Sequence, residues 1–507
     1  MQNKIKEGFS TKKYLDAQAE AIKERFSKFP GRLYLEFGGK LIDDFHATRT
    51  LPGYEPNAKV SLLLSLKKNL EIIYCISAKQ LQQRKIRGDL NLPYNQATLK
   101  ALTDLKGFNL PLLCVVINRY NGETEADIFK KRLERMGIKV YLRHEIKNYP
   151  NNLSNILGKN GYGKDPYIKT TKPLVVVWGA GPGSGKLSTC LGQIYLDQKK
   201  GLNSGYAKFE TFPVWDLPLN HPINWAYEAA TADLGDYNLI DPFHKKYHKK
   251  IAVNYNRDVE AFPIIEKLIK QMIPKNNFMH QYYSPTDMGV NQIAKGIIDD
   301  KILCEAAKKE IVFFLFRYRN EYNRGLVDKE VITRMEKLMK KLKLTENSLK
   351  TVPAARKACQ IAKTQKNKGE GKICCGSAIE LHNGEIITGK NSPLLYSEAS
   401  AILNAIKSIT EIPDSYELIS KQIIKKINSQ KQLLGENSNS LTTAEALLAL
   451  AVSSITNPLA KKAQTALQQL ENCYFHSTHH LSLDDEAIFR KLGIWVTTDG
   501  LQKEDQA

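Results

Sequence analysis

Short apolar runs alternate with helix-like stretches along the first half of the chain, and this alternation predicts a sheet built from crossover units. Helix-like stretches such as Glu125–Met136 and Leu187–Lys199 separate the runs. Strands joined through helices form a mostly parallel, doubly wound sheet that binds ligands beyond the carboxyl ends of its strands. The predicted strands are Leu33–Phe37, Glu71–Ser77, Leu112–Asn118, Lys139–His144, Leu174–Trp178, Tyr206–Phe209 and Ile251–Asn254.

Beyond these strands the pattern becomes helical. Two lysine-rich stretches with apolar residues at helical spacing, Cys304–Asn323 and Asp328–Leu342, predict long helices. Pro353 and the run Lys366–Lys372 are typical of a connection. We therefore expect three parts: an α/β phosphate- or nucleotide-binding domain (1–262), a helical domain (263–355) and a smaller C-terminal α/β domain (356–507).

The C-terminal part contains a strong hairpin signal. Two alternating runs flank Asn383-Gly384, so Ser377–Gly389 is predicted to be a hairpin. Further elements are expected as helices at Ser397–Ser408 and Thr442–Ser454, and as strands at Asn472–Ser477 and Ile494–Thr498.

The hairpin followed by a helix resembles the opening of the cytidine-deaminase fold. That family places a zinc ligand and a catalytic glutamate at the start of this helix. Here Glu398 has no cysteine or histidine ligand before it, and the chain has no C-x-x-C pair. We therefore expect the fold without its zinc ligands. The later cluster of His476, His479 and His480 with neighbouring acids is either a zinc site or an exposed strand end.

Composition places the chain among ordinary globular proteins. Of its 507 residues, 42% are hydrophobic and 25% are charged. We find no run of ~18 apolar residues and no signal-peptide core, so a membrane helix is not expected. The eight cysteines are scattered, which favours a reduced, cytoplasmic protein.

The charge of the chain is strongly positive, with a formal net value of +21. Its lysines are spread along the sequence, without the interleaved arginines and aromatic residues of a nucleic-acid surface. We therefore expect a small-molecule partner rather than nucleic acid. The oligomeric state stays open, with a homo-oligomer among the alternatives.

A glycine-rich loop from Ala180 to Thr189 carries the clearest chemical signal. It follows the strand Leu174–Trp178 and opens a helix. Glycines let backbone N–H groups turn towards a ligand, and the helix N-terminus adds a positive field, so such a loop attracts phosphate. Lys186 would reach the β- and γ-phosphates of ATP. The expected nucleotide contacts are Gly181, Gly183, Ser184, Gly185, Lys186, Ser188 and Thr189.

The loop departs from the common G-x-x-x-x-G-K-[ST] pattern at two positions. Ala180 stands in place of the first glycine, and Leu187 in place of the hydroxyl residue that contacts Mg²⁺. This arrangement resembles the adenylate-kinase variant, in which the hydroxyl comes two residues after the lysine. Ser188 is then the candidate Mg²⁺ contact. A glycine-rich turn without ligand and a site for another phosphoester remain as alternatives.

The strand after the loop helix ends in Lys208 and Glu210, next to the expected phosphate site. This layout resembles that of CTP synthetase and dethiobiotin synthetase. The resemblance implies that Lys208 contacts substrate or phosphate and that Glu210 holds Mg²⁺. We take Lys186, Lys208 and Glu210 as candidate catalytic residues. The alternative is a partly buried ion pair at the end of a strand.

Further polar residues follow other predicted strands and are candidates for substrate binding. Asp43 and Asp44 could bind a metal or an amine, and the Ser284–Asn291 segment is expected to close over the site. A plain loop is the alternative for the N-terminal group. The acids Glu228, Asp233, Asp236 and Asp241, with His244, form a further polar concentration. The candidate substrate contacts are Gly39, Lys40, His46, Arg49 and Arg257.

Five segments together resemble a bacterial family catalogued as a domain of unknown function, DUF1846. They are Leu35–Leu41, Pro182–Lys186, Tyr206–Phe212, Ser284–Asn291 and His476–His479. The resemblance implies a cytosolic protein of three parts and brings no established reaction.

The motifs themselves predict an enzyme that uses ATP and Mg²⁺ on a small metabolite, by phosphoryl transfer or ATP-driven ligation. The alternative is a non-catalytic protein that binds a nucleotide or phosphometabolite, or acts as a scaffold.

Overall fold

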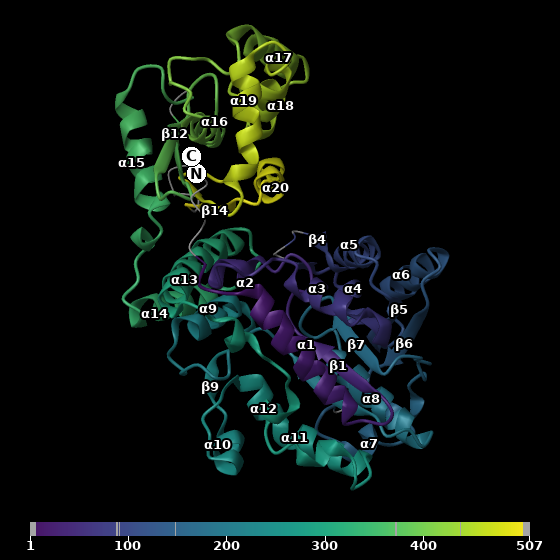
Figure 1. Cartoon of the computed structure of the whole chain (residues 1–507). Coiled ribbons are helices and arrows are strands. Elements are labelled where there is room, and N and C mark those ends of the chain that lie inside the picture. Colours follow the sequence, from purple (N-terminus) through teal and green to yellow (C-terminus); the bar gives the residue numbers. More distant parts are fainter. Residues whose placement is uncertain are drawn as a thin grey trace. The chain divides into compact units, whose positions relative to one another are not determined.

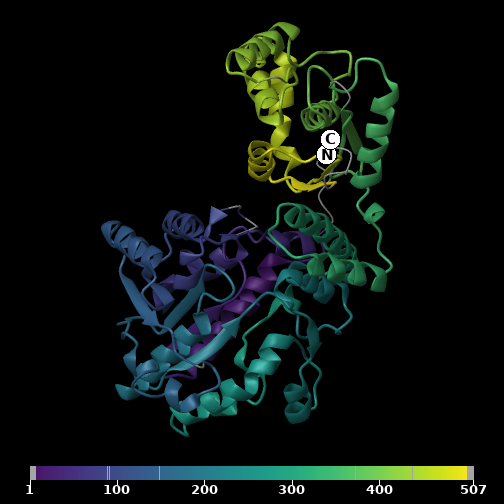
Figure 2. The same cartoon turned by 180° about the vertical axis from the view of Figure 1, so that it is seen from behind.

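The structure is a computed structural model in which residues 7–87, 90, 92–147, 149–370, 373–436 and 438–499 are described. It divides into an N-terminal unit, Lys6–Ala307, and a C-terminal unit, Lys308–Ala507. Each unit has its own sheet, as Figure 1 and the view from behind in Figure 2 show. The three-part division expected from the sequence stays a prediction.

A six-stranded sheet forms the centre of the N-terminal unit, in the order β6-β5-β2-β7-β1-β8. Every neighbouring pair of strands is parallel. These strands are six of the seven that the hydrophobic pattern predicts, so the mostly parallel α/β sheet is confirmed. Their bounds are β1 Leu33–Phe37, β2 Leu70–Ser77, β5 Leu112–Tyr120, β6 Val140–His144, β7 Leu174–Gly179 and β8 Gly205–Phe209.

The seventh predicted strand, Ile251–Asn254, belongs elsewhere. It is β10 (Val253–Tyr255), which pairs in antiparallel fashion with β9 (Asn238–Ile240) in a separate two-stranded sheet. The outer side of β8 is instead bridged to Gly289 through Lys208. An apolar run shows that a strand forms but does not show which sheet it joins, because pairing depends on the edge available in space. A second small sheet pairs β3 (Ile86–Arg87) with β4 (Leu92–Pro93).

Helices cover both faces of the main sheet. Tyr34 and Tyr206 point to the face of α8, where Tyr34 donates to Asp197 at 3.0 Å. On the other face, Phe37 stacks on Phe209 at 4.3 Å, and α3 supplies Lys59 above the Phe209 ring. The helices of this unit are α1 Thr11–Ser27, α2 Phe45–Thr50, α3 Ala58–Ser65, α4 Ala78–Gln82, α5 Tyr94–Gly107, α6 Thr124–Arg135, α7 Leu153–Ile156, α8 Lys186–Lys199, α9 Pro222–Ala230, α10 Pro242–His248, α11 Asn256–Met272 and α12 Pro285–Met288.

The C-terminal unit has a smaller sheet in the order β12-β11-β13-β14. The predicted hairpin is confirmed as β11 (Gly376–Glu380) and β12 (Ile386–Lys390), with Gly384 at a φ of 83° in the turn. The predicted final strands are β13 (Tyr474–Ser477) and β14 (Trp495–Thr498), which pair in parallel. This unit buries its own core of alanine, leucine and isoleucine side chains between the sheet and its helices.

One residue of the C-terminal region, Pro353, lies in a different kind of element than the sequence predicted. Pro353 lies in the first turn of α15 rather than in a connection. Proline is tolerated there because the first N–H groups of a helix have no intrahelical partner. The bounds are α13 Asp300–Asn323, which begins in the N-terminal unit, α14 Lys329–Lys341, α15 Thr351–Thr364, α16 Ser397–Ile409, α17 Lys421–Leu433, α18 Thr443–Ser453, α19 Pro458–Thr465 and α20 Leu483–Lys491. Within the described part of the chain, no helix combines the length and apolar character needed to cross a membrane.

Candidate functional site

Three segments that are distant in the sequence meet at the carboxyl edge of β7, β1 and β8. In the parallel register, Glu36 of β1 lies opposite Val177 of β7 and Lys208 of β8. The loop after β7, the turn after β1 and Glu210 after β8 therefore begin side by side. A Cβ atom added to Gly38 would lie 2.4 Å from Cγ of Glu210, so the close approach requires glycine.

The glycine-rich loop after β7 contains two glycines with a left-handed backbone conformation. Gly183 and Gly185 take φ values of 73° and 85°, which side-chain-bearing residues rarely adopt. Gly185 immediately precedes α8, and a Cβ atom on it would lie 2.6 Å from Cγ of Asn118. Glycine is thus needed at this position for conformation and for space. The loop leads directly into the N-terminus of α8, where backbone N–H groups lack helical partners.

A buried polar network supports the loop from the side of β5. Asn118 donates to the carbonyl of Ser184 at 2.8 Å and accepts from Arg143 at 3.0 Å. Arg143 is in turn held by Asp165, to which its Nε donates at 2.9 Å, and both side chains are buried. Such a network fixes the loop, because breaking any member leaves a buried polar group without its partner.

The predicted hydroxyl contacts lie within this network. Thr189 is fully buried and donates to the carbonyl of Gly185 at 2.9 Å. The Ser188 hydroxyl accepts from Arg143 at 3.4 Å. Lys186 differs from both: it is partly exposed, and no ion pair or side-chain hydrogen bond engages it among the residues that the structure describes. The loop thus presents one available cation at the start of α8.

Lys208 and Glu210 lie in a cluster that we call the β8 cluster, formed by Glu36, Lys208, Glu210, Tyr255 and Asp258. The Lys208 ammonium lies 3.3 Å from Glu210, 2.5 Å from Asp258 and in contact with the Tyr255 hydroxyl. Tyr255 also donates to Glu210 at 3.2 Å. Glu36 accepts from Tyr206 at 2.9 Å. Lys208 is therefore surrounded by acceptors.

Burial and charge shift the pKa values in the β8 cluster. Burial raises the pKa of Glu210 to about 7, against the opposing effect of Lys208 and with further increases from Asp258 and Glu36. Burial alone would lower the pKa of Lys208, but Asp258, Glu210 and Glu36 raise it above its ordinary value. A carboxyl that titrates near neutral pH can accept or donate a proton during a reaction.

The Cys190 thiol on α8 is affected by residues of both the loop and the β8 cluster: burial raises its pKa, Glu36 adds to the rise, and Lys186 opposes it. The loop and the β8 cluster therefore favour ligands of opposite charge, although both lie at one edge of the sheet. The loop is suited to an anion, whereas the carboxylates of the β8 cluster outnumber its lysine and are suited to a cationic group.

The predicted contacts after β1 take largely structural roles. Asp44 caps α2 and forms a buried ion pair with Lys59 at 2.8 Å. Burial opposes the charged form of Asp44, but Lys59 lowers the pKa of its carboxyl. Gly39 has a φ of 66°, and the carbonyl of Lys40 accepts from Lys59 at 2.9 Å.

The other two predicted contacts from this segment lie on α2. The His46 ring packs on Phe212 at 5.1 Å, and Arg49 is buried. Each role as a substrate contact stays a prediction.

Arg257 lies next to the β8 cluster. Its guanidinium donates to Asp236 at 2.6 Å and lies 5.6 Å from the centre of the Tyr255 ring. Among the other acids singled out in the sequence, Glu228 accepts from the backbone of Asn238 and Asp241 caps α10. Asp236 is thereby linked to the cluster through Arg257 and the Tyr255 ring.

Sequence patterns gave no role to two members of this neighbourhood: Glu36 lies in a predicted strand, and Tyr255 directly follows one. Asn291, which accepts from the Glu210 backbone at 2.8 Å, ends the segment that was expected to close over the site. A polar residue inside an apolar strand, such as Glu36, is the one signal that was available. Tyr255 enters the site only through tertiary folding.

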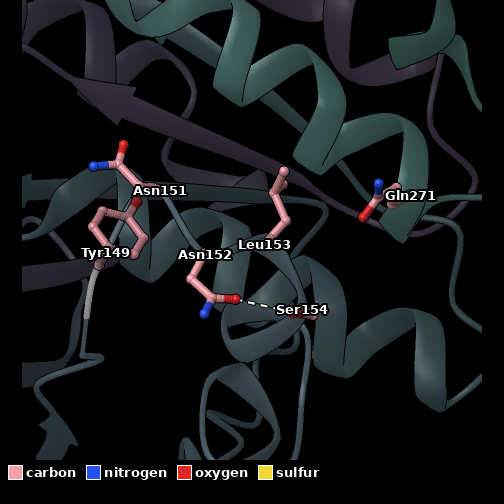
Figure 3. Close-up of a pocket in the computed structure, with 6 residues that line it drawn as sticks. All are labelled: Tyr149, Asn151, Asn152, Leu153, Ser154 and Gln271. Carbon is pink, nitrogen blue, oxygen red and sulfur yellow. Dashed lines mark hydrogen bonds between the residues drawn. The ribbon is translucent and has the colours of Figure 1, made fainter.

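A pocket of about 720 Å³ opens on the same unit, between the segment before α7 and the end of α11. Figure 3 shows its side chains, with Asn152 and Ser154 hydrogen-bonded at 2.9 Å and Gln271 projecting from α11. The Tyr149 side chain at this pocket is 37% exposed. The lining residues are Tyr149, Asn151, Asn152, Leu153, Ser154 and Gln271.

Two groups of potential metal ligands lie outside the predicted site. In the described ranges, the groups of three with ligand atoms within 4.8 Å of one another are His244, His248 and Asp287, and His221, Asp300 and Cys304.

The C-terminal polar residues take buried positions. His476 is fully buried, with Nδ1 2.9 Å from Thr497 and Nε2 3.4 Å from Asp499, and it belongs to neither of the two ligand groups. Glu398 at the start of α16 accepts from Ser397 at 3.0 Å and from Ser477 at 2.5 Å. Serine hydroxyls thus satisfy the buried carboxylate in this unit.

Comparison with known proteins identifies relatives along almost the whole chain. Residues 7–343 match the family described as domain of unknown function DUF1846, N-terminal, and residues 349–506 match its C-terminal counterpart. A UPF0371 protein of Clostridium botulinum (strain ATCC 19397 / Type A) is 46% identical over 493 residues, 97% of each chain. A UPF0371 protein of Clostridium tetani is 45% identical over 496 residues, 98% of each chain. The chain therefore belongs to the DUF1846 family.

Proposed function

We propose that this protein binds a nucleotide phosphate, with ATP and Mg²⁺ as the expected ligands, on the loop between β7 and α8. The observation that carries the proposal is a loop bent by Gly183 and Gly185, followed by the helix N-terminus and by Lys186 without an ion-pair partner among the described residues. Backbone N–H groups and a helix N-terminus are suited to phosphate oxygens, and a lysine point charge completes such a site.

The β8 cluster supports a reaction on a small metabolite. Glu36, Glu210 and Asp258 are the carboxylates that would hold Mg²⁺ or the amine of a substrate. Glu210, with a pKa raised to about 7, would accept or donate the proton of the reacting group. Lys186 would stabilise charge on the phosphoryl group, and bound Mg²⁺ would neutralise phosphate oxygens. Phosphoryl transfer and ATP-driven ligation both fit this division of roles.

Two observations favour the non-catalytic alternative. Lys208 is held by Asp258, Glu210 and Tyr255, so it needs rearrangement before it can contact a substrate. The Ser188 hydroxyl, the expected Mg²⁺ ligand, accepts instead from Arg143. A protein that senses a nucleotide or phosphometabolite needs neither group to be available. The proposal also includes the resemblance of the C-terminal unit to the cytidine-deaminase fold. In this unit Glu398 would have no role in a zinc-dependent reaction.

Thermal unfolding with a nucleotide panel tests the proposal. The full chain is heated with ATP, ADP, GTP or inorganic phosphate, with and without Mg²⁺, as wild type and as Lys186→Ala. Ligand at ~100 times its dissociation constant stabilises the folded state by ~2.7 kcal/mol. We expect an Mg²⁺-dependent stabilisation that Lys186→Ala abolishes and that Lys199→Ala, at the other end of α8, retains. Absence of stabilisation by every nucleotide would overturn the proposal.

Turnover separates the two candidate functions. ATP hydrolysis or transfer that depends on an added metabolite and is lost in Lys186→Ala supports the enzyme. Nucleotide binding without turnover across metabolite pools supports the sensing or scaffold protein.

A further inference from the structure

Two histidines on α10 are spaced so that their side chains share one face. His244 and His248 are four residues apart, and their ring centres lie 4.6 Å from each other. Residues at this spacing are neighbours on a helix surface. α12 brings Asp287 against the pair, so the three side chains converge from two helices that are distant in sequence.

The distances between these side chains match a metal coordination shell. Nε2 of His248 lies 3.0 Å from the Asp287 carboxylate, and Nδ1 of His244 lies 3.7 Å from it. Ligand atoms that each sit 2.0–2.2 Å from Zn²⁺ are roughly 3.3–3.6 Å apart in a tetrahedron. The observed distances bracket that range. Nδ1 of His244 also lies 3.1 Å from the Ser284 hydroxyl, so forming the shell requires small side-chain rotations and the replacement of that hydrogen bond by the metal.

Buried contacts hold the two helices in this arrangement. Asp241, which is fully buried, caps α10 through the backbone N–H of His244 and accepts from the Thr286 hydroxyl of α12 at 2.7 Å. Asp287 is fixed separately, because the backbone N–H of Tyr283 donates to its carboxylate at 2.9 Å. The ligand positions are therefore preorganised by residues behind them, as in established metal sites.

We propose that His244, His248 and Asp287 form a binding site for a divalent transition-metal ion, with Zn²⁺ the best fit. Two imidazoles and one carboxylate suit Zn²⁺, Co²⁺ or Ni²⁺ and leave one position of a tetrahedron open to water or another ligand. Mg²⁺ and Ca²⁺ prefer oxygen ligands, so a site with two imidazole nitrogens does not suit them. The site uses no residue of the loop or of the β8 cluster, so it stands independently of the nucleotide proposal.

The second ligand group serves as a contrast. His221 accepts from the backbone N–H of Ile223 at Nδ1, 3.3 Å away, and its Nε2 faces Asp300 at 3.0 Å. A neutral ring that accepts at Nδ1 carries its proton on Nε2, which is the nitrogen that would have to bind the metal. This conflict makes the His221 group a hydrogen-bonded cluster and His221→Ala a matched control.

Metal titration of the full-length chain tests the site. The chelator-treated protein is titrated with Zn²⁺ by calorimetry and with Co²⁺ by visible absorption, which reports tetrahedral coordination. We expect one Zn²⁺ at this site, bound at least about 100-fold more tightly than Mg²⁺ or Ca²⁺. His248→Ala and Asp287→Asn each weaken Zn²⁺ binding at least about 10-fold.

Controls keep the test decisive. His248 is partly exposed, so His248→Gln should fold, and its far-ultraviolet circular dichroism should match that of the wild type. His221→Ala should leave Zn²⁺ affinity and the Co²⁺ spectrum unchanged. Zn²⁺ binding that survives both His248→Ala and Asp287→Asn, that is lost in His221→Ala, or that is no tighter than Mg²⁺ binding would overturn the proposal.

Discussion

The glycine-rich loop and the β8 cluster lie at the same sheet edge but are built in opposite ways. The loop is contiguous in sequence, is bent by glycines and presents Lys186 without an ion-pair partner among the described residues. The cluster joins residues of β1, β8, β10 and α11 with Glu210 directly after β8, and its lysine is surrounded by Asp258, Glu210 and Tyr255. The two lysines therefore differ in availability: Lys186 has no ion-pair partner among the described residues, whereas Lys208 is engaged by two carboxylates and a tyrosine hydroxyl.

The largest expected effect comes from removing the cation of the β8 cluster. Lys208→Met leaves the buried Glu36 and the largely buried Glu210 and Asp258 without their cation, so we expect a loss of about 3–5 kcal/mol in unfolding free energy. Asp258→Asn in the same chain should restore part of it. Urea unfolding followed by tryptophan fluorescence measures this, since Trp178, Trp215 and Trp225 lie in the N-terminal unit. An unchanged midpoint would show that the cluster is not held by its charges.

Two glycine substitutions in the loop compare the energetic cost of backbone strain with that of steric crowding. At Gly183 an added Cβ meets nothing within 4 Å. The only cost of Gly183→Ala is therefore the strain of a φ of 73°, and we expect the free energy of unfolding to fall by about 1–2 kcal/mol. At Gly185 the same atom also meets Asn118, and we expect about 2–4 kcal/mol. Thermal unfolding of both variants gives the difference. Equal costs would mean that Asn118 moves freely and does not brace the loop.

The raised pKa of Glu210 predicts that the stability of the protein depends on pH. Its pKa of about 7 exceeds the ordinary 4.5, so between these values the folded state retains a proton that the unfolded chain has released. The stabilisation from this group is therefore complete below pH 4.5 and is lost as pH rises through 7. Glu210→Gln removes that loss, so its stability relative to wild type should rise by roughly 1–3 kcal/mol across the window.

Urea unfolding at several pH values measures this difference. Glu134→Gln, which alters an exposed carboxyl on α6, provides the control and should run parallel to wild type. A Glu210→Gln curve parallel to wild type as well would contradict the raised pKa.

The smallest expected effect on stability is at Lys186. Without an ion pair to break among the described residues, Lys186→Ala should change the unfolding free energy by no more than about 0.5 kcal/mol. The same variant should lose the nucleotide-dependent stabilisation. A large loss of stability without ligand would place Lys186 with Lys208 as a structural residue and remove the contrast between the two regions.

Local pattern accounts for most of the fold. Six predicted strands form the main sheet, and the hairpin around Asn383-Gly384 is present, because strand propensity and turn chemistry act over a few neighbouring residues. The strand at Val253–Tyr255 was identified correctly but placed in the wrong sheet. Its neighbours are chosen by the edge available after the other elements have packed.

In the candidate site, too, some features follow from local sequence and others only from tertiary packing. The sequence by itself determined the glycine-rich loop, the helix that follows it and the lysine and glutamate at the end of β8, because each depends on residues close together in the chain. Only the tertiary structure decided that Tyr255 joins the β8 cluster, that Asn291 contacts the Glu210 backbone, and that Asp287 faces His244 and His248. Side-chain chemistry at such places depends on burial and on partners from other segments, which no local pattern encodes.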